Sequence, residues 1–215
     1  FLLNFFANHG LLQIKNRPQW KVIKGGSSQY LDKLTMNYRD KIRLNCPVTS
    51  ITRNHEGVDV ESPSSGKEHF DYVFLSCHSD QALSLISDAS LIEREILGSI
   101  PYQSNEAVLH TDDSLMPKNK KAWAAWNYFI PTENIGVATL TYNMNILQRL
   151  NSKKQYLVTL NNDKNINPEK ILSRIKYAHP IFSLKGMGMQ ARQEEINCHR
   201  TFFCGAYWRN GFHED

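Results

Sequence analysis

The chain has 215 residues, of which 41% are hydrophobic and 21% are charged, and its formal net charge at pH 7 is +4. A chain of this length and composition can bury a sizeable core, as one large domain or as parts of two. Its basic residues are scattered, and their one cluster, Lys118–Lys121, follows Pro117 in a polar turn that is typical of a solvated loop. We therefore expect no nucleic-acid partner.

Cysteine and histidine spacing argues against disulfides and metal sites. The four cysteines form no C-x-x-C pair and have apolar neighbours, which favours reduced core thiols in a cytoplasmic protein. The eight histidines show no H-x-x-x-H spacing, so no metal site is expected. The apolar segment Phe1–Phe6 is too short for a membrane span or a signal peptide and has no basic flank, and it is expected to be helical.

The next segment predicts a strand, a glycine break and a helix. Trp20–Ile23 has the composition of a strand, Gly25 and Gly26 end it, and Ser27 is placed to cap a helix. The apolar residues of that helix recur at helical spacing, at Tyr30, Leu31, Leu34 and Tyr38. A glycine pair that leads into a capped helix is either a ligand-facing loop or only a tight connection.

Residues 42–75 predict a β-meander that returns to a buried strand. The β-rich runs are Ile42–Leu44, Val48–Thr52, Val58–Val60 and Phe70–Leu75. Turn-forming segments with Pro or Gly separate them.

A strand–turn–helix unit is predicted after the meander. Asp80 is placed to cap a helix through Ile86, and Asp88 to cap a second helix through Leu97. The adjacent Cys77 and His78 would point to opposite faces of a strand, so a catalytic Cys–His pair is not expected.

Residues 101–198 predict a second layer of α+β structure. The expected strands are 106–110, 123–129, 136–142 and 155–160. Asn143–Leu150 and a segment from Pro168 to Lys176, capped by Asn167, are expected to be helical. The aromatic residues Trp123, Trp126, Tyr128 and Phe129 either pack the core of a sheet face, which is favoured, or line an apolar substrate pocket.

The sequence Gly186–Ala191 fits G-x-G-x-x-A, a pattern of dinucleotide-binding loops. The strand that follows at Phe202 comes too soon for a βαβ crossover. We therefore interpret Gly186–Ala191 as a flexible glycine turn.

The last fifteen residues are the best candidate for a ligand-binding segment. Thr201–Cys204 predicts a strand buried on both faces, and Gly205 ends it. A strand that stops on glycine, followed by the small Ala206, lets the backbone pass close to a flat ligand. Gly211 starts a second tight turn, which leads to acidic residues in a first helical turn.

Three blocks of sequence follow one another in the order in which a known family carries them. They are Lys21–Tyr30, Cys46–Ile51 with Phe70–Cys77, and Phe203–Gly205 with Gly211–Glu214. Together they resemble the flavin-containing amine oxidase superfamily, FAD-dependent oxidoreductases related to monoamine oxidases and to desaturase-like flavoproteins. The resemblance implies an α/β (α+β) fold in which part of a glutathione-reductase-like FAD-binding domain is interleaved with a mixed-sheet substrate domain. It implies FAD-domain portions at 1–100 and 199–215 and a substrate domain at 101–198.

The resemblance also implies which residues hold the cofactor. They are Gly25, Gly26, Val48, Gly205, Ala206, Trp208, Gly211, Phe212 and Glu214. Val48 would meet the adenine end of FAD through its backbone, unless it merely packs a hairpin. Family members open with a strand–GxGxxG–helix unit that seats the pyrophosphate, and no such unit precedes these blocks, so we expect a C-terminal fragment that is inactive alone.

The expected function is oxidation by a flavin, which removes hydride from a C–H bond of an apolar or amine substrate and passes electrons to oxygen or another acceptor. Many family members carry a lysine near the flavin on the strand that corresponds to Ser104–Val108, where this chain has none. Asn105 or Glu106 is a possible replacement, and no catalytic residue is assigned. The alternative is a flavin-free binding or scaffold protein that keeps the fold.

Overall fold

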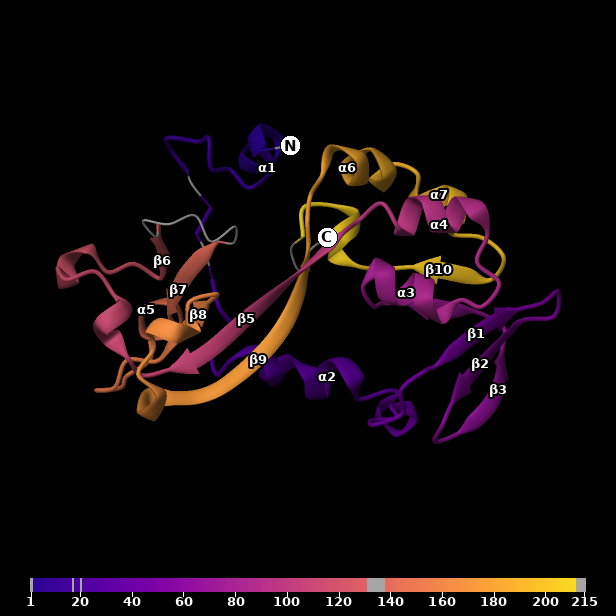
Figure 1. Ribbon diagram of the computed structural model, residues 1–215, viewed down its shortest axis with the longest axis horizontal. Coiled ribbons are helices and arrows are strands. Elements are labelled where there is room, and N and C mark those ends of the chain that lie inside the picture. Colours follow the sequence, from indigo (N-terminus) through magenta and orange to yellow (C-terminus); the bar gives the residue numbers. More distant parts are fainter. Residues whose placement is uncertain (1, 17, 20, 131–137, 212–215) are drawn as a thin grey trace. The chain divides into compact units, whose positions relative to one another are not determined.

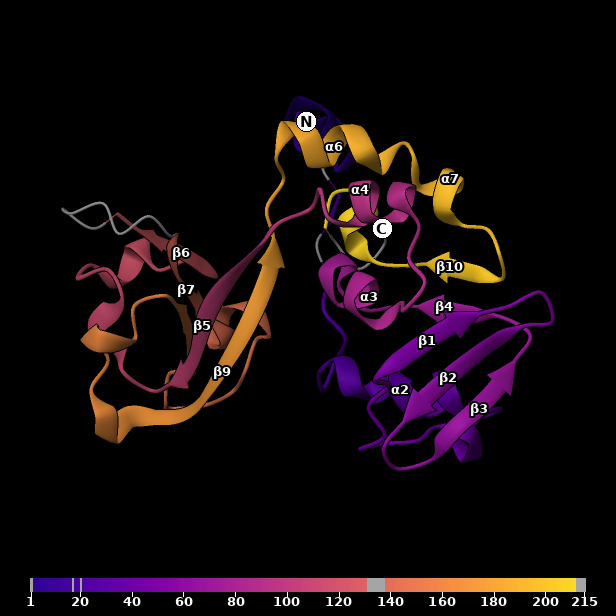
Figure 2. The same ribbon diagram turned by 45° about the vertical axis from the view of Figure 1, so that its right-hand side comes forward.

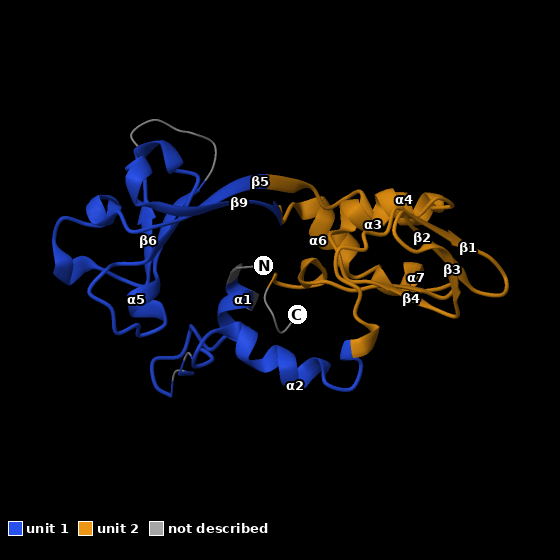
Figure 3. Cartoon of the chain, turned by 90° about the horizontal axis from the view of Figure 1, so that it is seen from below, with its two compact units in different colours: residues 1–39, 104–179 blue, residues 40–103, 180–215 orange. Residues whose placement is uncertain are grey.

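The computed structural model describes residues 2–16, 18–19, 21–130 and 138–211. The chain divides into two compact units, and each combines two stretches that are distant in sequence (Figure 3). Unit 1 comprises residues 1–39 and 104–179, and unit 2 comprises residues 40–103 and 180–215. The mixture of helices and sheets confirms the expected fold class. The functional domains 1–100, 101–198 and 199–215 stay a prediction.

Unit 2 contains a β-meander, a parallel strand pair and four α-helices in its described residues (Figure 1). The strands are β1 Ser50–Arg53, β2 Val58–Ser62, β3 Gly66–Phe70, β4 Val73–Leu75 and β10 Thr201–Phe203. The helices are α3 Ser79–Leu85, α4 Leu91–Leu97, α6 Leu184–Gln190 and α7 Gln193–Ile196.

Unit 1 contains most of a five-stranded sheet and three α-helices in its described residues. The strands are β5 Tyr102–His110, β6 Trp126–Phe129, β7 Thr139–Asn143, β8 Leu157–Leu160 and β9 Ile171–Pro180. The helices are α1 Leu2–Asn8, α2 Leu31–Thr35 and α5 Met144–Leu147. Short 3₁₀ turns in the chain lie at Ser27–Tyr30, Arg39–Lys41, Asp113–Leu115, Lys120–Ala122, Asp163–Asn165, Pro168–Lys170 and Ala206–Trp208.

Strands β1, β2 and β3 form an antiparallel sheet in chain order. Asn54 fixes the first hairpin, because its side-chain oxygen accepts the backbone N–H groups of Glu56 and Gly57 at 2.9 and 2.8 Å. Ile51 and Val58 of this sheet are buried. The backbone N–H of Ser87 donates to the Ile51 carbonyl at 2.9 Å, which ties the meander to the segment after α3.

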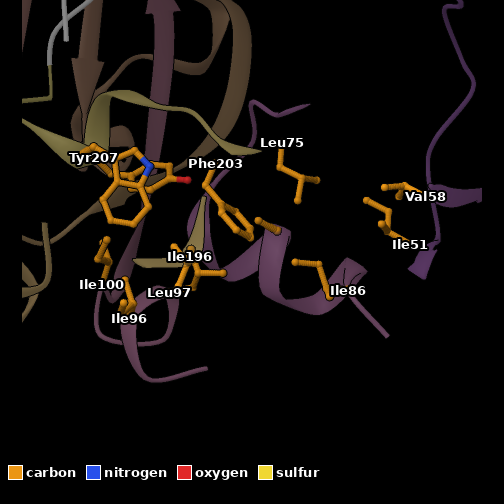
Figure 4. Packing of buried hydrophobic residues seen from close by; sticks show 12 residues of the cluster. Ile51, Val58, Leu75, Ile86, Ile96, Leu97, Ile100, Ile196, Phe203 and Tyr207 are labelled. Atoms are coloured by element: carbon orange, nitrogen blue, oxygen red, sulfur yellow. The ribbon is translucent and has the colours of Figure 1, made fainter. Parts of the chain in front are cut away.

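The hydrophobic core of unit 2 joins the meander, the parallel pair and the helices (Figure 4). Phe203 and Leu75 come from the paired strands, and Ile96 comes from α4. Phe203 and Ile96 are fully buried. Replacing a buried Phe by Ala typically costs about 3–5 kcal/mol, so Phe203 is a principal determinant of this core.

The sheet of unit 1 has the strand order β6-β7-β8-β5-β9. The long strands β5 and β9 run in opposite directions (Figure 2), and the Thr111 N–H donates to the Lys170 carbonyl at 2.9 Å where the pair ends. The sheet buries a polar chain: His110 Nε2 lies 2.7 Å from the Thr159 hydroxyl, which lies 2.9 Å from that of Thr141. Burial lowers the pKa of His110, and its Nδ1 accepts the backbone N–H of Asp112, so the ring is neutral and Nε2 donates.

Several predicted elements are confirmed. The initial helix, the strand at 201–204 and the four strands expected between 106 and 160 are present, with bounds shifted by a few residues. Of the expected meander, the strands at 48–52 and 58–60 are present as β1 and β2, and the strand expected at 70–75 is present only as β4, while β3 was not expected. The two helices after the meander are present as well, but their caps are His78 and Ser90 instead of Asp80 and Asp88. Ser90 forms a capping box with Glu93, whose carboxylate accepts the Ser90 N–H at 2.7 Å.

The predicted helix through Lys176 is wrong. Asn167 and Pro168 do start a helical turn, since the Asn167 side chain accepts the Glu169 N–H at 3.0 Å, but the turn ends at Lys170. β9 follows from Ile171. Pairing with β5 satisfies the backbone there and overrides the local helix signal.

The expected glycine turn at Gly186–Ala191 is also wrong, because α6 runs through both glycines. The side chain of Ser183 caps the helix by accepting the Gly186 N–H at 3.0 Å. A Cβ on Gly186 would lie 3.2 Å from the Ser99 carbonyl oxygen. Gly186 therefore serves close helix packing instead of ligand binding.

Three further expectations are wrong, because these segments find no covering partner among the described residues. The segments 21–23 and 42–44 are not strands among the described residues, and Leu44 is 81% exposed. The aromatic residues of β6 do not pack a core: Trp126, Tyr128 and Phe129 are exposed, since β6 is an edge strand of the sheet.

Candidate functional site

The carboxyl ends of β4 and β10 form the candidate site in unit 2. The two strands are parallel, with Phe203 opposite Leu75, and the Cys204 N–H donates to the Leu75 carbonyl at 3.0 Å. The residues that follow each strand, Ser76 and Gly205 among them, therefore emerge at the same edge. Ligands of α/β proteins bind at this edge of a parallel sheet.

Gly205 follows β10 with φ 156° and ψ 154°. A Cβ here would lie 2.8 Å from Tyr207 Cδ1 and closer still to Cε1. The expectation was that this glycine leaves room for a flat ligand, but the ring of Tyr207 takes the space in this structure. Gly205 thus has a structural reason to be glycine that is independent of any ligand.

Three buried polar groups at this edge make no hydrogen bond of good geometry among the described residues. They are the hydroxyl of Tyr207, the indole N–H of Trp208 and the hydroxyl of Ser79. Trp208 nevertheless contacts Tyr207, and Ser79 contacts Tyr102, closely enough to oppose the effect of burial on the pKa of each phenol. Each such unmade hydrogen bond costs about 1–3 kcal/mol, so several in one region are unusual. FAD carries many hydrogen-bond acceptors along its dinucleotide, and a donor set of this kind fits that chemistry.

The beginning of α3 contributes further side chains to the same edge. The Ser79 N–H donates to the Tyr102 hydroxyl at 2.9 Å, and the His78 ring stacks on Tyr102 with centroids 4.5 Å apart. Burial raises the pKa values of Cys77, Tyr102 and Tyr207. These groups are therefore protonated at neutral pH, and the edge can bind and orient a ligand without supplying a thiolate or phenolate.

Val48 lies apart from this edge, in an open depression of about 570 Å³ on the meander side of unit 2. Arg43 and Glu68 form an ion pair in its lining, with Nη2 and Oε2 2.9 Å apart. Hydrogen bonds from Arg43 and Ser65 lower the pKa of Glu68 to about 2. The Cys46 thiol accepts the Ser64 hydroxyl at 3.1 Å, and hydrogen bonds from Ser62 and then Ser64 lower its pKa.

The remaining expected cofactor residues are spread over both units. Ala206 and Trp208 stand beside Gly205 in the Ala206–Trp208 turn. Gly211 has φ +89°, and a Cβ on it would lie 3.1 Å from the Phe182 ring. Phe212 and Glu214 lie outside the described residues.

Gly25 and Gly26 belong to unit 1, with φ +85° and +91°. Gly26 occupies the N-cap position of the Ser27–Tyr30 turn, and a Cβ on it would meet no atom within 4 Å. Space beside Gly26 is therefore open. The positive φ values explain both glycines without a ligand, and their role in holding a cofactor stays a prediction.

The two residues considered as replacements for the missing lysine, Asn105 and Glu106, lie in unit 1. The Asn105 side chain lies 2.9 Å from His179 Nδ1 and accepts the Asn161 side-chain amide at 2.7 Å. Glu106 accepts a hydrogen bond from Arg174 at 2.7 Å. The ion pair gives Glu106 a structural role.

Sequence reasoning missed Ser79, Tyr102 and Tyr207 as members of the edge. The position of Tyr207 two residues after a strand-ending glycine was the available signal. Ser79 and Tyr102 are 23 residues apart in sequence and meet only through folding. No group of three or more metal-ligating side chains occurs among the described residues, and in the part of the chain that the structure describes no helix has the length and apolar character to cross a membrane.

Solved structures share the fold of this chain. The fatty acid isomerase from P. acnes that produces CLA aligns with a TM-score of 0.55 and 16% identity over 86% of this chain and 53% of its own. Cyclohexylamine oxidase from Brevibacterium oxydans aligns with a TM-score of 0.53 and 12% identity over 85% of this chain and 47% of its own. Putrescine oxidase bound to putrescine aligns with a TM-score of 0.55 and 12% identity over 83% of this chain and 46% of its own. The chain therefore has the α/β fold of these three enzymes.

The sequence profile of flavin containing amine oxidoreductases matches residues 3–161, and the chain belongs to this family. FAD is thus the cofactor of the family to which the chain belongs. No match was found among curated proteins. The chain spans about half the length of the solved structures named above.

Proposed function

We propose that the whole protein is an FAD-dependent oxidoreductase that acts on a small molecule, either apolar or an amine. When bound, the flavin would take up hydride from a C–H bond of the substrate and pass the electrons to oxygen or another acceptor. The protein would act in the cytoplasm. We also expect residues 1–215 alone to be inactive, because their one G-x-G-x-x-A sequence lies inside α6.

The observation that carries this proposal is the edge beyond β4 and β10, where buried donors make no well-formed hydrogen bond. The Tyr207 hydroxyl and the Trp208 indole N–H contact each other but reach no acceptor with good geometry among the described residues, and acceptors on a bound dinucleotide would satisfy them better. The backbone at Gly205 and Ala206 would lie against the cofactor, and Trp208 would border the ring system. Membership of the flavin-containing family supports the same cofactor.

The residues of this edge would bind and orient the cofactor and do no proton transfer of their own. Burial raises the pKa values of Cys77 and Tyr207, which leaves both protonated at neutral pH. Positioning by protein groups while the cofactor supplies the redox chemistry is the usual division of labour in such enzymes.

The test is the flavin content of the purified full-length protein, measured from the visible absorption band of oxidised flavin. We expect one flavin per chain in the wild type and a marked loss in Trp208→Phe, which removes the N–H and keeps an aromatic ring. Trp126→Phe is the matched control, because Trp126 lies exposed in β6 of unit 1. A colourless full-length protein that binds no added FAD would favour the flavin-free scaffold instead.

A further inference from the structure

Unit 1 is basic and unit 2 is acidic, although the charged residues are scattered along the sequence. Unit 1 carries 16 Lys and Arg residues against 7 Asp and Glu residues, and unit 2 carries 9 against 14. An excess of positive charge on one compact unit attracts anions over roughly 8 Å at physiological ionic strength. Unit 1 is therefore the part of the chain that favours an anionic ligand.

An open depression of about 660 Å³ in unit 1 has three basic side chains in its lining. They are Lys21, Lys24 and Arg149, and none of the described residues that line the depression is acidic. A volume of this size is typical of the sites that bind small molecules.

The charged groups of these three side chains are unpaired. Among the residues that the structure describes, they make no ion pair, side-chain hydrogen bond or cation–π contact. Arg43, Arg53 and Arg174, by contrast, all pair with carboxylates. Positive charges that line one depression with no carboxylate between them repel one another, and a bound anion offsets that repulsion.

The wall that α5 forms is held in place by hydrogen bonds. The Asn143 side chain accepts the Ile146 N–H at 3.1 Å, and the Asn143 N–H donates at 2.8 Å to the carbonyl of Ala125, which also lines the depression. The Asn145 side chain accepts the Tyr156 N–H at 2.8 Å. This wall is therefore formed before a ligand binds, which reduces the entropy lost on binding.

Apolar side chains lie beside the basic ones. Val22 stands between the basic residues 21 and 24 in sequence and is 53% exposed, and Ile146 is 43% exposed. Leu147 also lines the depression. An alkyl chain that covers these side chains removes apolar surface from water, which favours binding. A free inorganic anion would leave that surface exposed.

We propose that this depression binds an anionic amphiphile, which is a small molecule with a phosphate or carboxylate head group on an alkyl chain. The head group would lie against Lys21, Lys24 and Arg149. The alkyl chain would cover Val22 and Ile146. None of the expected cofactor residues lines the depression, so the proposal does not rest on the flavin site.

Titration calorimetry on the full-length protein at low ionic strength tests this proposal. We expect decyl phosphate, kept below its micelle-forming concentration, to bind saturably, and inorganic phosphate to bind at least about tenfold more weakly because it lacks the alkyl chain. Decanoate is titrated in the same way to compare the head groups, and saturable binding of either amphiphile supports the proposal. Failure of both to bind, or equal affinity for inorganic phosphate, would overturn it.

A charge substitution locates the binding. Arg149→Gln is expected to weaken the binding of the amphiphile at least about tenfold, because it removes a charge-assisted hydrogen bond to the head group. Lys164→Gln is the matched control, since Lys164 is exposed in unit 1 and does not line the depression. It makes the same change in charge, and a weakening below about twofold is expected.

Two results of this comparison would also overturn the proposal. Equal weakening in Arg149→Gln and Lys164→Gln would assign the binding to the overall charge of unit 1. Bound flavin, measured from visible absorption, is expected to be the same in Arg149→Gln as in the wild type. A loss of flavin in that variant would assign the depression to the cofactor.

Discussion

The ring of Tyr207 occupies the position that a side chain on Gly205 would need, with Cδ1 2.8 Å from an ideal Cβ and Cε1 closer. Tyr207 is 4% exposed and belongs to the core of unit 2. The glycine that ends β10 is therefore linked to the packing of the core as well as to the proposed cofactor edge.

Gly205→Ala should destabilise the protein by about 2–4 kcal/mol, since overpacking adds to the strain of a side chain at positive φ. Chemical denaturation measures this. Gly26→Ala is the control, because Gly26 has φ +91° with no atom near its Cβ position, and about 1 kcal/mol is expected there. Combining Gly205→Ala with Tyr207→Leu should cost less than the sum of the two single changes.

The sequence alone predicts that Gly205→Val abolishes flavin binding without unfolding the protein. The contact between a Cβ on Gly205 and the ring of Tyr207 changes that prediction. The structure indicates that valine would displace Tyr207 as well, so flavin loss in Gly205→Val is informative only alongside a measured stability. Equal stability and full flavin content in this variant would contradict both roles of the glycine.

Arg53→Met should destabilise the protein by about 3–5 kcal/mol, because it leaves the Glu93 carboxylate buried without its partner. Their side chains are 8% and 3% exposed, and Nη2 lies 2.9 Å from Oε2. Urea denaturation at neutral pH measures the loss.

The matched control for that change is Arg43→Met. Arg43 pairs with Glu68 in the same two-point geometry, but its side chain is 55% exposed. Exposed pairs contribute about 0–1 kcal/mol. Similar losses in both variants would show that the burial of the first pair is unimportant.

Asp112 should make stability depend on pH below about 4. Burial opposes its ionisation, but hydrogen bonds from the Asn167 N–H, Lys170 and Ser114 outweigh it and lower the pKa to about 2. Because the folded-state pKa lies below the unfolded value, the contribution is present above pH 4 and is lost as pH falls toward 2. Its size is about 2 kcal/mol.

Denaturation curves between pH 5 and pH 2 check this prediction. Asp112→Asn should reduce the loss of unfolding free energy between pH 5 and pH 2 by about 2 kcal/mol. Asp113→Asn, at the exposed neighbour, serves as the control. An unchanged slope in Asp112→Asn would mean that Asp112 does not carry the effect.

Thr159→Val should destabilise the protein by about 2–4 kcal/mol, because it removes a hydroxyl that bonds both His110 and Thr141 and leaves buried groups unpaired. Thr139→Val is the isosteric control. The Thr139 hydroxyl is buried and has no partner among the described residues, so its replacement is expected to be neutral or stabilising. The midpoint temperature of thermal unfolding should therefore fall in Thr159→Val and stay unchanged or rise in Thr139→Val.

Local sequence signals predicted much of the fold. Alternating β-rich runs gave the meander and the strands β5, β7 and β8, since their residues pair with strands that are close in the chain or have clear periodicity. Where the signal was local but the outcome depended on a distant partner, prediction failed. Pro168 predicts a helix, yet pairing of β9 with β5 converts the following residues to strand.

The candidate site was predictable only in part. The sequence identified Gly205, Ala206 and Trp208, because a glycine that ends a buried strand is a recognisable pattern. It did not identify Ser79 and Tyr102, which bond to each other although they are 23 residues apart in sequence. Nor did it predict that Gly186 serves helix packing against Ser99.

The sequence by itself determined the fold class, the family resemblance and the strand endings, because these depend on residue patterns within short windows. Only the tertiary structure decided that Tyr207 fills the space beside Gly205 and that Gln193 and Asn197 bond the outer edge of β10. The physical reason is that hydrogen bonds and excluded volume depend on which distant segments meet in space, and spacing along the chain does not encode this directly.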